Sequence, residues 1–345
     1  MGGLSKKGFQ FNQIATDSGK PHLTLDAGNL LFKHDTINPK LEAQEKLTAE
    51  AIVEAYNLIG YQAVGVGSKD LIAGIPYLQA LAKKAKFTWL SANLVAKTSK
   101  KPLFKASTTL KVGSIKAGVI GITGQLPLAS ADQATLLSWE EVLPRLVAKV
   151  AKRHDLVILL SNLPAAENQR IAEAHANIHL IIQSGATSNT ISPGPINNTL
   201  LASTGPQGKQ VGILTINWQP GKRWGDQKAE LLAKKKGTLD RLLWQLSKYQ
   251  QDKDPETALR NQPDQLKAYQ ILKAREQELR DDIERMTKEF SKAPPSKGEP
   301  SSFGNRFLAM ETNLPDQPEI ARLTDRLDAA IQQLGQQKAK DQNGH

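Results

Sequence analysis

Short apolar runs alternate with longer segments of helical periodicity through the first 190 residues of the chain. Apolar runs bounded by glycine or polar residues predict buried strands, and they lie at residues 23–27, 63–67, 87–92, 110–122 (a hairpin), 156–160 and 178–182. Apolar residues three and four positions apart predict helices at residues 6–14, 39–60, 75–84, 138–153 and 165–176. Strand pairing dominates in residues 199–218. This order predicts an α/β domain with two packed sheets.

The pattern changes near Gly225. Residues 229–249 and 265–290 are long, charged helical segments joined by residues 252–263. Leu279, Ile283, Met286 and Phe290 alternate at four- and three-residue spacing, which is typical of a coiled-coil seam. We therefore expect three regions: a domain at 1–225, an antiparallel helical hairpin at 226–295, and a final region at 296–345. The final region would hold a linker, a short strand (303–311), a helix (318–334) and a frayed tail.

The chain is basic, with a net charge of +11. Its lysine runs lack the interleaved aromatic residues that single-strand binding favours, so we interpret them as solvated faces and expect no nucleic-acid partner. The chain contains no cysteine. Disulfides, Cys-ligated zinc and covalent haem attachment within this chain are thereby excluded. No segment approaches the roughly 20 apolar residues of a membrane span, and residues 1–7 contain no apolar stretch typical of a signal peptide.

Polar side chains stand at the ends of several predicted strands. Asn29 follows the strand at 23–27, Asp70 follows 63–67, and Asn162 follows 156–160. A polar loop that includes Gly185 and Thr187 follows 178–182. Because ligands bind at the carboxyl ends of parallel strands, these positions predict the functional site.

These segments resemble the calcineurin-like metallophosphoesterases, specifically the 5′-nucleotidase/UDP-sugar hydrolase branch. Residues 23–29 read Leu-Thr-Leu-Asp-Ala-Gly-Asn, where that branch reads Leu-Asp-Ala-Gly-Asp. Matching flanks follow in the same order at residues 54–61, 90–94 and 119–123, so the resemblance covers about residues 2–220. It implies a two-sheet sandwich flanked by helices. It also implies two metal ions that bind the phosphate and generate a hydroxide nucleophile.

Most positions that would hold those metals carry other residue types. The replacements are Asn29 for the bridging Asp, Ser68 for an Asn, Lys69 for a His, Asn162 for a His, and Gly185 and Thr187 for the last two His. Only Asp70 keeps the family's residue type, and it is not a primary ligand there. The family's first motif, Asp-x-His, would precede Gly2-Gly3-Leu4. Neutral oxygens hold divalent cations poorly and Lys69 would repel them, so we expect no metal and no other cofactor.

These replacements favour a catalytically inactive protein that serves as a structural or protein-interaction module. One alternative is a phosphate or nucleotide binder in which Lys69 supplies the charge of the metals. The competing interpretation of Lys69 is a salt bridge with Asp70 or exposure to solvent. A second alternative is a weak 5′-nucleotidase-type hydrolase completed by an upstream segment. His175 and His179 straddle a helix end and a strand start, so we interpret them as polar surface residues.

Partners and location follow from the hairpin and from the resemblance. The hairpin at 226–295 either packs against the sheet domain or serves as a docking arm for a protein partner. Some relatives are fused to multihaem cytochrome segments, which implies a possible cytochrome association. Because the family is mostly exported in bacteria, the resemblance implies a periplasmic or other extracytoplasmic location.

Overall fold

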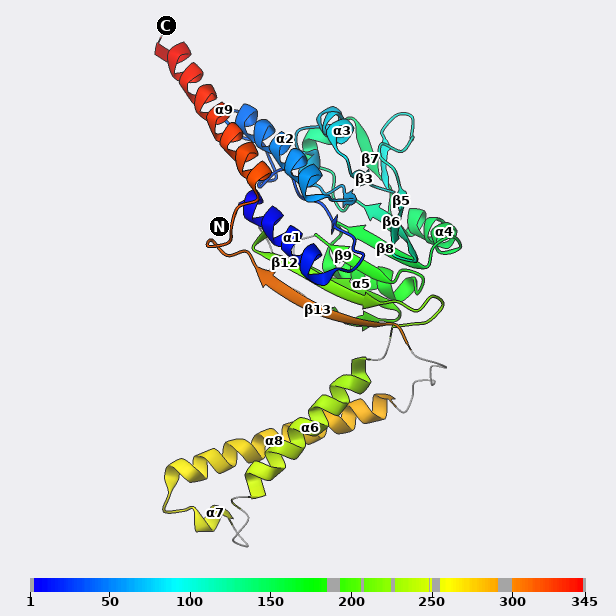
Figure 1. Ribbon diagram of the computed structural model, residues 1–345. Coiled ribbons are helices and arrows are strands. Elements are labelled where there is room, and N and C mark those ends of the chain that lie inside the picture. Colours follow the sequence, from blue (N-terminus) through cyan, green and yellow to red (C-terminus); the bar gives the residue numbers. More distant parts are fainter. Residues whose placement is uncertain are drawn as a thin grey trace. The chain divides into compact units, whose positions relative to one another are not determined.

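A computed structural model describes residues 3–184, 193–205, 208–224, 227–247, 249, 255–290 and 300–343. The chain forms two compact units (Figure 1). The first contains Met1–Arg223 and Ser302–His345, and the second contains Trp224–Ser301.

Two sheets form the centre of the first unit. The smaller sheet holds three parallel strands in the order β1 (Leu25–Asp26), β2 (Ala63–Gly65) and β3 (Thr88–Leu90). The larger sheet has the order β10-β11-β9-β8-β6-β5. Its strands are β5 (Ser107–Val112), β6 (Ile115–Ile122), β8 (Leu156–Ser161), β9 (Leu180–Gln183), β10 (Pro195–Ile196) and β11 (Thr199–Ala202). A short antiparallel pair, β4 (Leu94–Ala96) and β7 (Ala134–Leu136), follows the smaller sheet. The predicted α/β class is confirmed.

The two sheets pack closely through residues without bulky side chains. A Cβ atom on Gly121 of β6 would lie 2.3 Å from the carbonyl oxygen of Leu90 in β3. The backbone N–H of Ala92 also donates to the carbonyl oxygen of Gly121 at 2.8 Å. The backbones of the two sheets therefore touch here, and the strand ends of both sheets come to one edge of the sandwich.

Helices cover the outer face of each sheet. On the smaller sheet these are α1 (Leu4–Ser18), α2 (Glu42–Ile59) and α3 (Ile75–Lys84), and Val53 of α2 and Leu78 of α3 belong to the same core cluster as Trp89 of β3. On the larger sheet they are α4 (Trp139–Ala151) and α5 (Ala165–Ala174), whose core residues include Leu143 and Ile171. The ends of these helices follow from the sequence. Gly60 ends α2 in the left-handed conformation, and the Ser138 side chain accepts the N–H of Glu141 at the start of α4.

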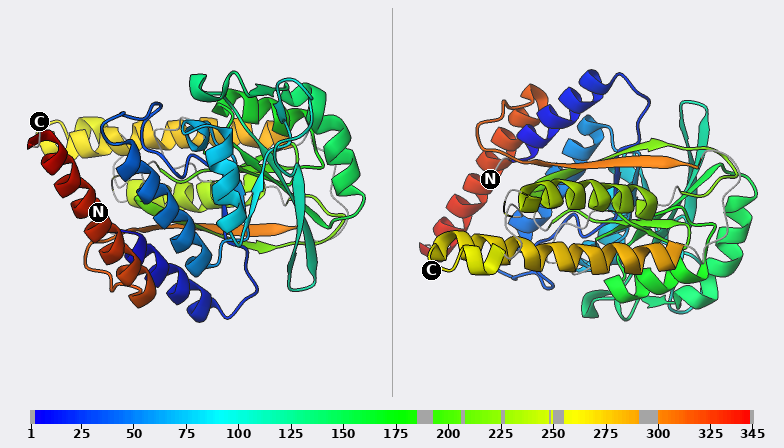
Figure 2. Two further views of the ribbon diagram at one scale, coloured as in Figure 1. Left: turned by 90° about the horizontal axis from the view of Figure 1, so that it is seen from above. Right: turned by 90° about the horizontal axis from the view of Figure 1, so that it is seen from below.

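The chain returns to the first unit after residue 301. Strand β13 (Ser302–Ala309) pairs antiparallel with β12 (Gln210–Asn217) along its whole length (Figures 1 and 2). Helix α9 (Pro318–Asn343) buries Ile320 and Leu323 against Ala51 and Ala55 of α2. The sequence sets residues 296–345 apart as a separate region with a frayed tail. The structure instead joins β13 and α9 to the first unit, and α9 continues to Asn343.

The second unit is an antiparallel helical pair. Helices α6 (Gln227–Ser247) and α8 (Pro263–Phe290) are connected through the short helix α7 (Pro255–Ala258). Lys235 pairs with Asp282 at one end, and the rings of Tyr249 and Tyr269 lie 5.7 Å apart at the other. Of the predicted seam, Leu279, Ile283 and Met286 are half-buried, while the side chain of Phe290 lies outside the described residues. Among the helices of the described ranges, none is long and apolar enough to cross a membrane.

Candidate functional site

The carboxyl ends of four parallel strands bring Asn29, Ser68, Asn162 and Ser184 together. Asn29 follows β1 and adopts a left-handed backbone with φ of 62°, which asparagine tolerates better than most residues. The loops after β1 and β2 lie in contact, since a Cβ atom on Gly67 would be 2.3 Å from the backbone nitrogen of Asn29. The structure thus places these strand ends at one edge of the sandwich.

The amide of Asn29 is hydrogen-bonded on both of its sides. Its Oδ1 atom accepts the backbone N–H of Lys69 at 3.0 Å and the hydroxyl of Ser68 at 3.4 Å. Its Nδ2 atom donates to the carbonyl oxygen of Ser184 at 3.1 Å. The side chain therefore ties the end of β1 to the ends of β2 and β9.

Asn162 makes a second set of contacts from the end of β8. Its Oδ1 atom accepts the backbone N–H of Ser68 at 2.9 Å, and its Nδ2 atom donates to the hydroxyl of Ser184 at 3.2 Å. The Ser184 hydroxyl in turn donates to the carbonyl oxygen of Ala27 at 2.7 Å. These six hydrogen bonds form what we call the strand-end network: a closed set of neutral groups that joins both sheets.

Ser184 is a member of this network that sequence reasoning missed. The available signal was its position directly after β9, at the start of the polar loop in which the sequence indicated Gly185 and Thr187. Gly185 and Thr187 themselves lie outside the described residues.

Asp70 lies beside the network and is completely buried. Its Oδ1 atom accepts the N–H groups of Leu30 and Leu31, and its Oδ2 atom accepts those of Asn29 and Gly67, all between 2.7 and 2.9 Å. Burial raises the pKa of this carboxyl to about 6, although the four N–H donors act in the opposite direction. The carboxylate thus holds the loops after β1 and β2 together and has its acceptor atoms occupied by backbone groups.

Lys69 contributes its backbone, and not its ammonium, to the strand-end network. The Nζ atom donates to the carbonyl oxygen of Lys33 at 2.8 Å and lies 3.7 Å from the carboxylate of Asp35. The sequence-based interpretation offered a salt bridge with Asp70 or exposure to solvent. The structure excludes the salt bridge with Asp70, whose oxygens face backbone N–H groups, and it shows a partly exposed lysine that pairs with the loop after β1.

Ser91, Asn93 and Thr123 form a buried polar cluster next to the strand-end network. The hydroxyl of Thr123, at the end of β6, donates to the carbonyl oxygen of Val66 after β2. Asn93 donates to the carbonyl oxygen of Thr123 and accepts its N–H, and the hydroxyls of Ser91 and Thr123 lie 2.8 Å apart. These contacts connect β2, β3 and β6 at the edge that carries Asn29. They therefore fix the positions of the three strand ends relative to one another.

A half-buried lysine of α1, Lys7, is linked to β1 through Tyr56. The Lys7 ammonium donates to the hydroxyl of Tyr56 at 2.9 Å, and that hydroxyl donates to Asp26 at 2.8 Å. The other oxygen of Asp26 accepts the N–H of Gly28. The ammonium also lies 4.6 Å from the ring centre of Tyr56 and 5.2 Å from that of Tyr61. This chain of contacts holds the turn that precedes Asn29.

His179 is half-buried, so it is more enclosed than the expected polar surface position. Its Nδ1 atom accepts the backbone N–H of Val157 at 2.9 Å, and its ring lies 4.5 Å from that of Trp218. Burial lowers the pKa of His179 to about 4, so the ring is neutral near pH 7. These contacts pack the start of β9 against its neighbours, and His179 makes none of the hydrogen bonds of the strand-end network. His175 is half-buried, at the end of α5.

Known proteins resemble this chain in sequence and in fold. No protein-family model matches the chain. The chain is 32% identical to protein UshA of Salmonella pullorum over 117 residues, which are 34% of this chain and 21% of UshA. It is 26% identical to the metallophosphoesterase YunD of Bacillus subtilis over 206 residues, which are 57% of this chain and 42% of YunD. The matched segments thus span less than half of either relative.

Solved structures agree on the fold. Sulfate thiohydrolase SoxB of Thermus thermophilus matches with a TM-score of 0.65 and 16% identity, over 96% of this chain and 48% of SoxB. A 5′-nucleotidase precursor from Thermus thermophilus matches with a TM-score of 0.54 and 21% identity, over 64% of this chain and 46% of that protein. The fold is that of the metallophosphoesterases. In sequence, the chain is similar to UshA and to YunD over the segments given above.

The residues at the strand ends do not fit the two metal ions that this fold implies. In the part of the chain that the structure describes, no group of three or more His, Cys, Asp or Glu residues could hold a metal ion. The atoms that face the network are amide and hydroxyl groups already bonded to one another. The carboxylate of Asp70, which lies beside the network, is bound to four backbone N–H groups.

Proposed function

We propose that this chain is a metallophosphoesterase-fold protein that does not catalyse two-metal hydrolysis and acts as a structural or protein-interaction module. The strand-end network carries this proposal. Where a hydrolase of this fold requires anionic and imidazole ligands, Asn29, Ser68, Asn162 and Ser184 satisfy one another.

The energetics favour the network over bound cations. Inserting two divalent ions would break most of its six hydrogen bonds, each with a net contribution of about 1 kcal/mol. It would also place the positive charge against neutral oxygens with no carboxylate free to balance it, since reorienting Asp70 would strand four buried N–H groups.

Metal analysis combined with a turnover assay tests this proposal. The full chain is purified, exposed to Mn²⁺, Zn²⁺ or Fe²⁺, desalted and analysed for bound metal. Hydrolysis of AMP, UDP-glucose and bis(p-nitrophenyl) phosphate is then measured. We expect substoichiometric metal and no metal-dependent turnover. An Asn29→Ala variant serves as the control for contaminating phosphatases, because it removes the centre of the network. Stoichiometric metal together with turnover that Asn29→Ala abolishes would refute the proposal.

Lys69 gives less support to a phosphate- or nucleotide-binding role. Its ammonium is bonded to Lys33 and Asp35, so an anion at the strand ends would have to displace both. Calorimetry with AMP and ADP, repeated on Lys69→Ala, separates the two functions. Binding by the unmodified protein that the variant loses would favour this alternative.

The second unit supports the interaction role. Helix α6 exposes Trp244 by 64% and helix α8 exposes Ile271 by 59%, although large apolar side chains are more often buried. We propose that this helical pair contacts a protein partner, with a multihaem cytochrome as one candidate by family resemblance. We also propose a periplasmic or other extracytoplasmic location, on the resemblance to the 5′-nucleotidase branch.

A further inference from the structure

Exposed basic side chains gather at the edge of the first unit that lies opposite the strand-end network. Strands β5 and β6 form an antiparallel hairpin in which Lys111 is the direct partner of Lys116, and both side chains are exposed. Strand β6 runs from Ile115 to Ile122, and Thr123 of the buried polar cluster follows its end. The two lysines therefore lie at the start of β6, a whole strand length away from the strand-end network.

The end of α4 packs against this hairpin (Figure 1). A Cβ atom on Gly118 of β6 would lie 2.3 Å from the side chain of Val150 and 2.9 Å from that of His154. Between these two contact residues the chain carries Lys152 and Arg153, which are both exposed. The packing of α4 thus brings two more cations beside the lysines of the hairpin.

The segment before β1 adds a fifth cation. A Cβ atom on Gly113, in the turn of the hairpin, would lie 3.4 Å from the ring of Pro21. The preceding residue, Lys20, is exposed. The fold therefore gathers basic residues from three separate segments into what we call the basic cluster: Lys20, Lys111, Lys116, Lys152 and Arg153.

The charges of the basic cluster are not balanced by ion pairs. In the part of the chain that the structure describes, no member of the cluster forms a salt bridge. Of the carboxylates in the same segments, Asp155 accepts the backbone N–H of Lys116 at 2.8 Å, and Asp17 is exposed in the last turn of α1. Like charges directly opposite each other on paired strands repel, as Lys111 and Lys116 do here. Their placement is unfavourable in the isolated chain and becomes favourable against negative charge.

The composition of the basic cluster favours anionic lipid headgroups over other polyanions. Arg153 is its one arginine, the other members are lysines, and none is aromatic. The cores of protein interfaces are instead depleted in lysine and enriched in aromatic residues and arginine. Single-stranded nucleic acids are bound through stacking on aromatic side chains. Lipid phosphates require positive charge close to the membrane surface, and the strongly hydrated ammonium of lysine supplies it.

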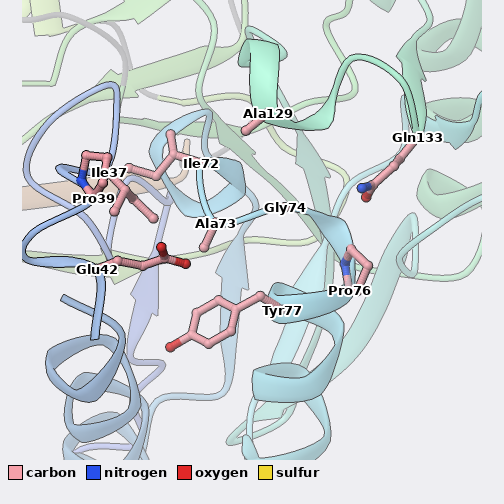
Figure 3. Close-up of a pocket in the computed structure, with 10 residues that line it drawn as sticks. All are labelled: Ile37, Pro39, Glu42, Ile72, Ala73, Gly74, Pro76, Tyr77, Ala129 and Gln133. Atoms are coloured by element: carbon pink, nitrogen blue, oxygen red, sulfur yellow. The ribbon is translucent and has the colours of Figure 1, made fainter. Parts of the chain in front are cut away.

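The cluster is open surface, separate from the cavity of the first unit. That cavity has a volume of about 450 Å³, and Ile37, Ile72 and Tyr77 are among its walls (Figure 3). None of the residues that line it belongs to the basic cluster. Because the members of the cluster are exposed and come from three segments, they match an extended anionic surface and not an enclosed small anion.

We propose that the basic cluster binds the surface of a membrane that contains anionic phospholipids and holds the first unit there peripherally. The attraction is electrostatic and acts within a Debye length, roughly 8 Å at physiological salt. It is therefore weakened by added salt and requires no segment to enter the hydrocarbon. Since the basic cluster and the strand-end network lie at opposite ends of β6, membrane binding does not depend on what the strand ends hold.

Co-sedimentation of the full chain with vesicles measures this binding. One set of vesicles contains phosphatidylcholine with about 30% phosphatidylglycerol, and the other contains phosphatidylcholine alone. The chain binds the anionic set and not the neutral one, and roughly 0.5 M NaCl releases it because salt screens the attraction. The double variant Lys111→Glu with Lys116→Glu weakens binding at least about tenfold, since two attractive charges become repulsive.

A matched control has the same change in charge at the other edge. Lys101 and Lys105 are exposed, and Lys105 lies at the carboxyl end of β3, because its carbonyl oxygen accepts the N–H of Ser91. Lys101→Glu with Lys105→Glu weakens binding by less than about threefold. Thermal unfolding of each variant checks that the fold is intact, and Lys111→Gln with Lys116→Gln, which removes charge without adding any, gives an intermediate loss of binding.

Several results would overturn the proposal. They are an absence of binding to the anionic vesicles, binding that high salt leaves unchanged, and equal losses in the cluster and control variants. Fluorescence anisotropy with a labelled DNA duplex supplies a further one. If the chain bound the duplex more tightly than the vesicles, and the cluster variant abolished that binding, the basic cluster would be a nucleic-acid surface instead.

Discussion

The Oδ2 atom of Asp70 accepts the backbone N–H of Asn29 at 2.9 Å, across 41 positions of the sequence. The same carboxylate accepts the N–H groups of Leu30, Leu31 and Gly67. The loops after β1 and β2 are therefore fixed by one buried side chain, independently of any bound ligand. The strand-end network forms on top of this connection.

Replacement of Asp70 by asparagine should destabilise the first unit strongly. An amide offers one acceptor oxygen, so the two N–H groups that face the new NH₂ group lose their partner while they stay buried. We expect a loss of about 2–5 kcal/mol in the free energy of unfolding, measured by urea denaturation. Asp132→Asn, at an exposed carboxylate, is the control and should change the value by less than about 0.5 kcal/mol. Equal effects of the two substitutions would contradict the role given to Asp70.

Restoring the family's acidic residue with Asn29→Asp should not restore a metal site. The new carboxylate would meet the carbonyl oxygen of Ser184, to which the Asn29 amide now donates. We expect a loss of about 1–3 kcal/mol in the free energy of unfolding, because a half-buried charge replaces a satisfied amide.

Mn²⁺ titration followed by calorimetry checks the other half of that prediction. Asn12→Asp, on the exposed face of α1, is the control for the change in charge. If Asn29→Asp bound Mn²⁺ stoichiometrically and lost no stability, the strand ends would still be adapted to hold metals, and the proposed function would have to be revised.

Periodicity predicted much of this fold because the information is local. The runs at 63–67 and 156–160 are apolar and are bounded by glycine or polar residues. The structure has β2 in the first run and β8 in the second. Each of these strands is parallel to its neighbours in its own sheet, and Ser68 and Asn162 follow their carboxyl ends, which is where the sequence places the candidate site.

Other features depend on contacts between distant residues and could not be predicted from local pattern. The direction of the Lys69 ammonium depends on the fold of the loop that carries Lys33 and Asp35. The return of α9 depends on the fit of Ile320 against α2, and the N–H of Gln317 donates to the carbonyl oxygen of Ser5 at the far end of the chain. The contact that half-buries His179 is with Trp218, which is distant in sequence.

Gly67→Ala should disrupt the strand-end network by steric contact. The added Cβ atom would lie 2.3 Å from the backbone nitrogen of Asn29 and 2.5 Å from its Oδ1 atom. We expect a loss of about 2–4 kcal/mol in the free energy of unfolding, since the backbone on one side must move. Gly237→Ala in α6 is the control, because no atom lies within 4 Å of its Cβ position. That change should stabilise its helix by about 0.5–1 kcal/mol. Similar effects at both glycines would contradict the close approach of the two loops.

His179 should make the first unit sensitive to acid between pH 6.5 and pH 4. Burial lowers its pKa from 6.5 to about 4, so the ring stays neutral in the folded chain while the unfolded chain takes up a proton. The contribution of this residue to stability is therefore full above pH 6.5 and is lost as the pH falls through that range. Linkage gives a loss of about 2–3 kcal/mol.

Urea unfolding at pH 7 and pH 4.5, compared between the unmodified chain and His179→Gln, measures this contribution. The glutamine oxygen can accept the N–H of Val157 but does not titrate, so the variant should lose less stability on acidification.

The raised pKa of Asp70 acts in the opposite direction, because its contribution is present below its ordinary pKa and is lost as the pH rises through about 6. That contribution is common to both proteins and cancels in the comparison. His22→Gln, at an exposed histidine, is the control and should follow the unmodified chain. If His179→Gln lost as much stability between the two pH values as the unmodified chain, His179 would not be the neutral group that its contact with Trp218 indicates.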